Sequence, residues 1–120
     1  MSAESRKIVA RKAAIQRWIR VRFGSPSFEA LGLPGGQAVD LGLASLAAGE
    51  ETMESLMVSL AAPRLRKEGV PLPRVVFADA DMRLYRLIER TDGDLAHTRY
   101  LARLRQLSSF ADACALARVS

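Results

Sequence analysis

The sequence has 120 residues, enough for a single domain that hides about two-thirds of the surface of its unfolded chain. Hydrophobic residues make up 49% and charged residues 26%, which excludes intrinsic disorder and fibrous classes. No apolar run approaches the roughly 18 residues of a membrane span, and the charges between Arg6 and Lys12 exclude a signal peptide, so we expect no membrane association and a cytoplasmic location.

The net charge of +5 is distributed unevenly. Residues 1–23 hold seven basic side chains and one acidic side chain, whereas residues 24–62 hold five acidic side chains and no Lys or Arg. Residues 63–74 are basic again, and residues 75–120 are nearly neutral. Such asymmetry bears on association with charged partners and does not determine the fold.

The first predicted helix runs to Phe23. Ser2 can cap its start, and Gly24-Ser25-Pro26 supplies a left-handed stop followed by a residue that cannot continue a helix. At 100° per residue, the helix has an apolar face that we expect to pack on the domain. This apolar stripe consists of Ile8, Ile15 and Ile19.

The opposite face of this helix is basic, and it is the feature of the sequence that most strongly suggests a function. Arg6, Arg17 and Arg20 cluster there, and Trp18 flanks the apolar stripe. A charged helix face is often only solvated. The functional alternatives are contact with nucleic acid, with an acidic protein, or with the acidic segment of another copy of the chain.

Two helices are predicted next. A short turn of helix over Phe28–Leu31 is expected to start at Ser25-Pro26. The pattern of Gln37–Ala48 predicts a mostly buried helix that stops at Gly49. Gly42 lies inside this helix, where it costs up to about 1 kcal/mol relative to Ala.

The following helix begins with acidic residues and ends with basic ones, as the helix macrodipole favours. Pro63 is expected to kink or break it, and Gly69 to close it. The acidic residues are Glu50, Glu51 and Glu54, and the basic ones are Arg64, Arg66 and Lys67.

After an extended Val70–Pro73, the apolar Val75–Phe77 is expected to be pinned against the core without a sheet. This segment and the two aspartates after it resemble the strand and paired aspartates of the haloacid-dehalogenase phosphotransferases, but Met82 and Arg83 stand where that family has Gly and Thr. We interpret Asp79 or Asp81 as the cap of the next helix.

The last helix is predicted over Asp94–Arg118, capped by its first residue, and it is expected to form an αα-hairpin with the helix before it. We expect the domain to be arranged around it, with Leu104 and Ala111 buried. Its predicted buried stripe is His97, Tyr100, Leu104, Leu107, Ala111, Cys114 and Ala115.

No catalytic, metal or nucleotide signature is found in the sequence. His97 and Cys114 are the only residues of their types, and they are separated by about 25 Å of helix at 1.5 Å per residue, so both are interpreted as structural. If residues 41–58 formed a helix-turn-helix, the helix that enters the DNA groove would place glutamates close to the phosphates, and their repulsion argues against this motif. Gly32–Gly36 lacks the Gly-Lys-Ser/Thr ending of a phosphate loop.

These observations predict an all-α bundle of four to five helices with a long C-terminal helix. We expect an intracellular interaction or regulatory module that self-associates, most simply as a homodimer, and that needs no metal or cofactor. The alternative is a nucleic-acid-binding protein that uses the basic N-terminal helix. In either case the candidate binding residues are Arg6, Arg17, Arg20 and Trp18.

Overall fold

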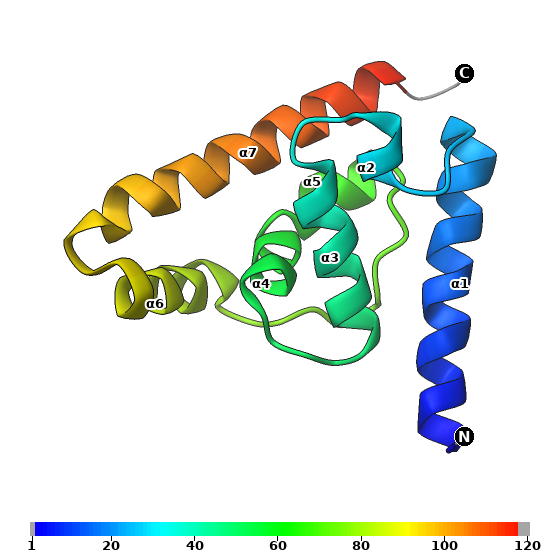
Figure 1. Cartoon of the computed structure of the whole chain (residues 1–120), viewed down its shortest axis with the longest axis horizontal. Coiled ribbons are helices and arrows are strands. Elements are labelled where there is room, and N and C mark those ends of the chain that lie inside the picture. The colour runs from blue at the N-terminus through cyan, green and yellow to red at the C-terminus, as the bar shows by residue number, and fades with distance from the viewer. Residues whose placement is uncertain (1, 118–120) are drawn as a thin grey trace.

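The computed structural model describes residues 2–117, which form an all-α domain (Figure 1). Five of the seven α-helices within this range have eight residues or more, in agreement with the predicted number, and the C-terminal one is the longest. The helices are α1 (Ala3–Phe23), α2 (Phe28–Leu31), α3 (Gly36–Ala47), α4 (Met53–Leu60), α5 (Ala62–Lys67), α6 (Ala80–Asp92) and α7 (Ala96–Ala117).

Most helix ends follow from local sequence signals. The Ser2 hydroxyl accepts a hydrogen bond from the Ser5 amide at 3.1 Å, and Gly24 ends α1 in the left-handed conformation with φ 73°. The expected interruption at Pro63 is confirmed, because α4 ends before it and α5 starts one residue before it. The cap of α4 is Thr52, which forms a reciprocal pair of hydrogen bonds with Ser55.

Helices α3 and α4 occupy the middle of the domain, with α6 and α7 on one side and α1 on the other (Figure 1). Gly42 allows α3 to approach α4 closely, because a Cβ atom there would overlap the carbonyl oxygen of Glu54 and a methyl group of Val58. The low helix propensity of this glycine is therefore offset by a contact that no larger residue permits.

Two clusters of buried side chains form the core. The first joins the end of α1 to α2, α3 and the C-terminal half of α7, and its largest members include Ile19, Phe28, Leu43 and Phe110. The second joins α4 and α6 to the rest of α7. Helix α7 thus contributes to both clusters, but it lies along one edge of the domain (Figure 1). The prediction that the domain is arranged around this helix is therefore wrong.

The face that α7 buries differs from the predicted stripe. Phe110 is fully buried although it was left off the stripe, Leu104 is only half-buried, and His97 and Ala115 are exposed. The predicted burial of Leu107, Ala111 and Cys114 is confirmed. The difference arises because one end of α7 packs against α6 and the other meets α2 through Phe110 and Phe28, so no single straight stripe meets both.

The start of α7 also differs from the prediction. A 3-10 turn over Gly93–Leu95 precedes it, so the α-helix begins at Ala96 and not at Asp94, and the predicted last residue, Arg118, lies outside the described range. The predicted pairing with the preceding helix is confirmed, since α6 and α7 pack against each other.

Three further local predictions need correction. Asp79 stands at the start of α6 but has φ 51°, and its side chain makes no capping hydrogen bond. Ser27, and not Ser25, caps α2, by accepting a hydrogen bond from the Ala30 amide at 3.0 Å. Val75, expected against the core, is 81% exposed.

Candidate interaction surface

Helix α1 is attached to the domain by its C-terminal half. Ile19 and Phe23, both in the last two turns, are its buried residues. Residues 2–14 are exposed apart from Ile8, which is half-buried. Figure 1 shows the N-terminal end of α1 extending past the rest of the domain. The first half of a helix about 31 Å long, at 1.5 Å per residue, is therefore left largely without cover.

The structure places the three predicted arginines on the uncovered side of α1. Arg6, Arg17 and Arg20 are all exposed, and none of these three arginines forms an ion pair among residues 2–117. Arg6 and Arg17 lie within about 20° of each other around the helix axis at 100° per residue, and Arg20 lies about 60° from Arg17. Their positive charges are therefore available to a partner.

Trp18 is placed differently from the arginines. Its half-buried ring meets Phe23 edge-on, with centroids 5.7 Å apart, and it packs on the first core cluster. The guanidinium of Arg22 lies over the ring at 5.7 Å from its centroid. Gly69 is also adjacent, since a Cβ atom there would lie 3.5 Å from the indole. Trp18 thus anchors α1 to the domain, and the structure does not join it to the arginine face.

Sequence reasoning missed a groove beside α1. One wall is formed by α1 at Ile15, and the other by the extended segment Pro71–Val75, with the end of α3 as the floor. The groove has a volume of about 490 Å³, within the range of ligand pockets. Arg11 and Arg74 both line it, so this apolar groove is flanked by positive charge.

Arginine side chains also fix the walls of this groove. Arg11 donates from Nη1 to the carbonyl oxygen of Ala47 at 3.2 Å, which ties α1 to the end of α3. Arg66 donates from Nη2 to the carbonyl oxygens of Pro73 at 2.9 Å and Arg74 at 3.3 Å, which holds the extended segment. Val75 stands exposed at the rim. The groove depends on the position of this hydrogen-bonded segment, and the periodicity of the sequence does not predict that position.

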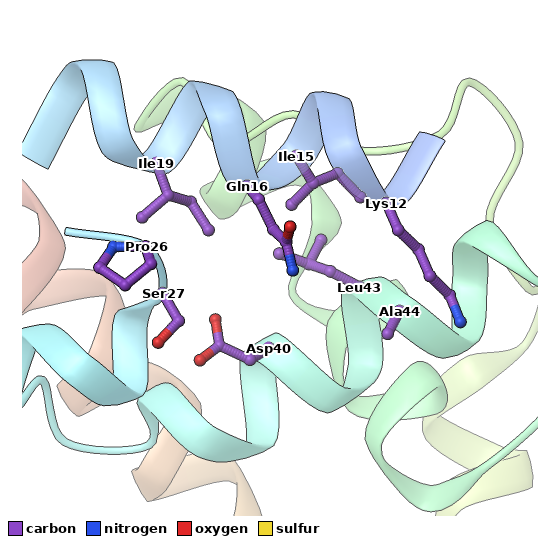
Figure 2. A pocket seen from close by; sticks show the side chains of 9 residues that line it. All are labelled: Lys12, Ile15, Gln16, Ile19, Pro26, Ser27, Asp40, Leu43 and Ala44. Atoms are coloured by element: carbon purple, nitrogen blue, oxygen red, sulfur yellow. The ribbon is translucent and has the colours of Figure 1, made fainter. Parts of the chain in front are cut away.

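A smaller pocket of about 110 Å³ lies between α1 and α3 (Figure 2). Its walls are mainly aliphatic, with Asp40 toward one end and Lys12 toward the other in this view. The Asp40 carboxylate accepts hydrogen bonds from the amides of Phe28 at 3.1 Å and Glu29 at 2.9 Å, so it joins α3 to the start of α2. Burial raises the pKa of Asp40 above its ordinary value of 3.8, against the opposing effect of these two hydrogen bonds.

Replacing Asp40 with Asn is expected to lower the free energy of unfolding by about 0.5–2 kcal/mol at low pH, because the NH2 group of Asn cannot accept a hydrogen bond from the second backbone amide, whereas both carboxyl oxygens of Asp40 can. The raised pKa means that the folded state binds more protons than the unfolded state above pH 3.8, so ionisation of Asp40 reduces stability as the pH rises through this window. The advantage of the wild type over Asp40→Asn should therefore shrink with rising pH. Urea unfolding of both proteins at several pH values measures it, and an advantage that grew with pH would contradict the assignment.

The described residues show no cluster for metal binding and no membrane-spanning helix. Within residues 2–117, no group of three or more His, Cys, Asp and Glu side chains is placed to hold a metal ion. In the same range, each helix is too short or too polar to cross a bilayer. Comparisons of the chain with protein-family models, curated proteins and solved structures found no match.

Proposed function

We propose that the protein is a small intracellular interaction module that self-associates through α1 and the groove beside it. The observation that supports this most directly is the apolar stripe of α1, of which the domain fully covers only Ile19. Ile15 and Ile8 are half-buried, and Val75 is exposed at the groove that Ile15 lines. Full burial of each such aliphatic side chain against a partner is favourable by about 1.5–3 kcal/mol.

Helix physics supports the same proposal. An isolated helix of fewer than about 12–15 residues is marginal in water, and most helical stability in proteins comes from packing of an apolar face. The first half of α1 has little such packing within the domain, although the sequence caps it with Ser2 and supplies Ile8. A second surface that covers this half would stabilise the helix and bury its apolar side chains together.

Nucleic-acid binding is the second candidate, and it rests on the exposed arginines. Arg6, Arg17 and Arg20 form no ion pair within residues 2–117, so they are free to contact phosphates. Three to five phosphate contacts would give a slope of log affinity against log salt of roughly −3 to −5. Single-strand binding surfaces combine such charge with stacking aromatics, whereas Trp18 is held at the domain edge. We therefore favour protein association.

Two variants on opposite sides of α1 separate these candidates. Ile8→Gln with Val75→Gln removes one apolar side chain from the first half of α1 and one from the groove and keeps the charge, whereas Arg6→Glu, Arg17→Glu and Arg20→Glu reverse the basic face. We expect light scattering to show an oligomer of the wild type at high micromolar concentration and low salt. The glutamine pair should raise its dissociation constant about tenfold or more, which corresponds to about 1.4 kcal/mol. Circular dichroism melting should confirm that both variants fold.

The same measurement with mixed-sequence DNA and RNA tests the alternative. Binding to either nucleic acid that is lost in the arginine variant, from a wild type that stays monomeric, would replace the proposed function by nucleic-acid binding. A monomeric wild type that also ignores nucleic acid would contradict both candidates. An oligomer that the glutamine pair leaves unchanged would show that association uses another surface.

A further inference from the structure

A second hollow in the domain carries the opposite charge to the groove. It has a volume of about 370 Å³ and lies over α3, between α2, α4 and α7. Leu41 of α3 lines it and is 50% exposed, an unusual exposure for a leucine in the central helix of the domain. Glu29 of α2 and Glu54 of α4 also line it. The hollow thus presents an aliphatic side chain together with two carboxylates.

Basic charge in this hollow is limited. Arg103 of α7 also lines it, and its Nη1 donates to Oε1 of Gln106 at 3.4 Å. The surrounding segment, residues 24–62, contains five acidic side chains and no Lys or Arg. Neither Glu29 nor Glu54 forms an ion pair among residues 2–117. Arg103 offsets one of these two charges, so the lining of the hollow carries a net negative charge.

We infer that the occupant of the groove is a second copy of this chain, whose exposed Leu41 packs over the groove between Arg11 and Arg74 while its Glu29 and Glu54 face these arginines. This inference rests on the proposed self-association and names the surface that α1 and the groove meet. The groove offers aliphatic walls flanked by two positive charges, and the hollow offers an aliphatic side chain beside two carboxylates and one guanidinium, which leaves a net negative charge. Opposite charges placed around an apolar contact favour the correct partner and its orientation.

In a two-fold arrangement, two chains that each carry both surfaces make two equivalent contacts. The Leu41 surface of one copy meets the groove of the other, and the reverse contact follows from two-fold symmetry. The expected species is a dimer. A head-to-tail contact without this reciprocity would leave one groove and one Leu41 surface open at the ends and would give masses that grow with concentration.

Two charge-reversed proteins test the pairing. The groove variant carries Arg11→Glu and Arg74→Glu, and the hollow variant carries Glu29→Lys and Glu54→Lys. Each variant alone should lose dimer affinity by about a hundredfold, since both contacts then oppose like charges and each such opposition costs roughly 1–2 kcal/mol. When the two are mixed, both contacts of the heterodimer are complementary again: a negative groove meets a positive hollow, and a positive groove meets a negative hollow.

The expected result for the mixture is a 1:1 heterodimer with an affinity within a few-fold of the wild-type dimer. Analytical ultracentrifugation with one variant fluorescently labelled measures it. Arg86→Glu with Arg90→Glu, which reverses two exposed charges on α6, a helix that lines neither surface, is the matched control and should leave the wild-type dimer unchanged. Because Arg11 also bonds to Ala47, Arg74→Glu alone, whose side chain makes no hydrogen bond among the described residues, serves if the double groove variant unfolds.

The outcomes separate this inference from the function on which it rests. A wild type that does not self-associate overturns both. A wild-type dimer that depends on Ile8 and Val75, with a mixture that fails to form the heterodimer, overturns the inference and leaves the proposed function standing. Masses that increase continuously with concentration would overturn the closed pair.

Discussion

Gly42→Ala is expected to destabilise the protein by about 1–3 kcal/mol, although Ala is the better helix former by up to about 1 kcal/mol. The added methyl group would overlap the carbonyl oxygen of Glu54, which belongs to the α4 backbone, and a methyl group of Val58. Backbone cannot move out of the way as a side chain can, so α3 and α4 must separate. Because these helices occupy the middle of the domain, the strain reaches both core clusters.

Urea unfolding measures this change, and a double variant shows its cause. Val58→Ala removes the side-chain part of the overlap and leaves the carbonyl oxygen of Glu54 in place. In a double-mutant cycle, Gly42→Ala should therefore cost less stability in the Val58→Ala background than in the wild type, but it should remain destabilising there. A stabilised Gly42→Ala protein would show that helix propensity outweighs the close approach, and the packing of α3 on α4 described above would then be wrong.

The elements of this fold could be predicted from sequence because their signals are local. Ser2 and Gly24 bound α1, Pro63 separates α4 from α5, and charges suit the macrodipole at both ends of this pair. The exposure of Arg6, Arg17 and Arg20 also follows from the 3.6 period, since these residues stand opposite the isoleucine stripe.

What the sequence could not supply depends on contacts between distant segments. Asp40 caps α2 from α3, and Gly42 meets α4, but neither relation leaves a spacing pattern in the chain. The groove of the candidate site forms where Arg66 holds Pro71–Val75 beside α1. This segment and α1 are far apart in the sequence, so a periodic pattern within either one does not predict their contact. A stripe drawn on an isolated α7 likewise missed Phe110, because the face that a helix buries is set by its neighbours.

Phe110→Ala is expected to produce the larger effect of the two stability variants, a loss of about 3–5 kcal/mol, because it removes a fully buried aromatic ring from a close-packed core. The Phe110 ring meets Phe28 edge-on with centroids 4.9 Å apart, and Phe28 in turn meets Phe23 at 5.5 Å. This row of rings joins α7 to α2 and to the end of α1, so the cavity would open where three helices converge.

The matched control lies on the same helix. Leu116→Ala also truncates a large apolar side chain of α7, but Leu116 is 88% exposed, so its loss should change the free energy of unfolding by less than about 0.5 kcal/mol. For a domain whose total stability is about 5–15 kcal/mol, the Phe110 variant should show a clearly lower denaturation midpoint with an unchanged slope. Because the row of rings ends at the base of α1, Phe110→Ala should also weaken self-association by loosening the helix that carries it. Equal stability of the two variants would mean that α7 is not held to α2 through Phe110, and the first core cluster would need to be redrawn.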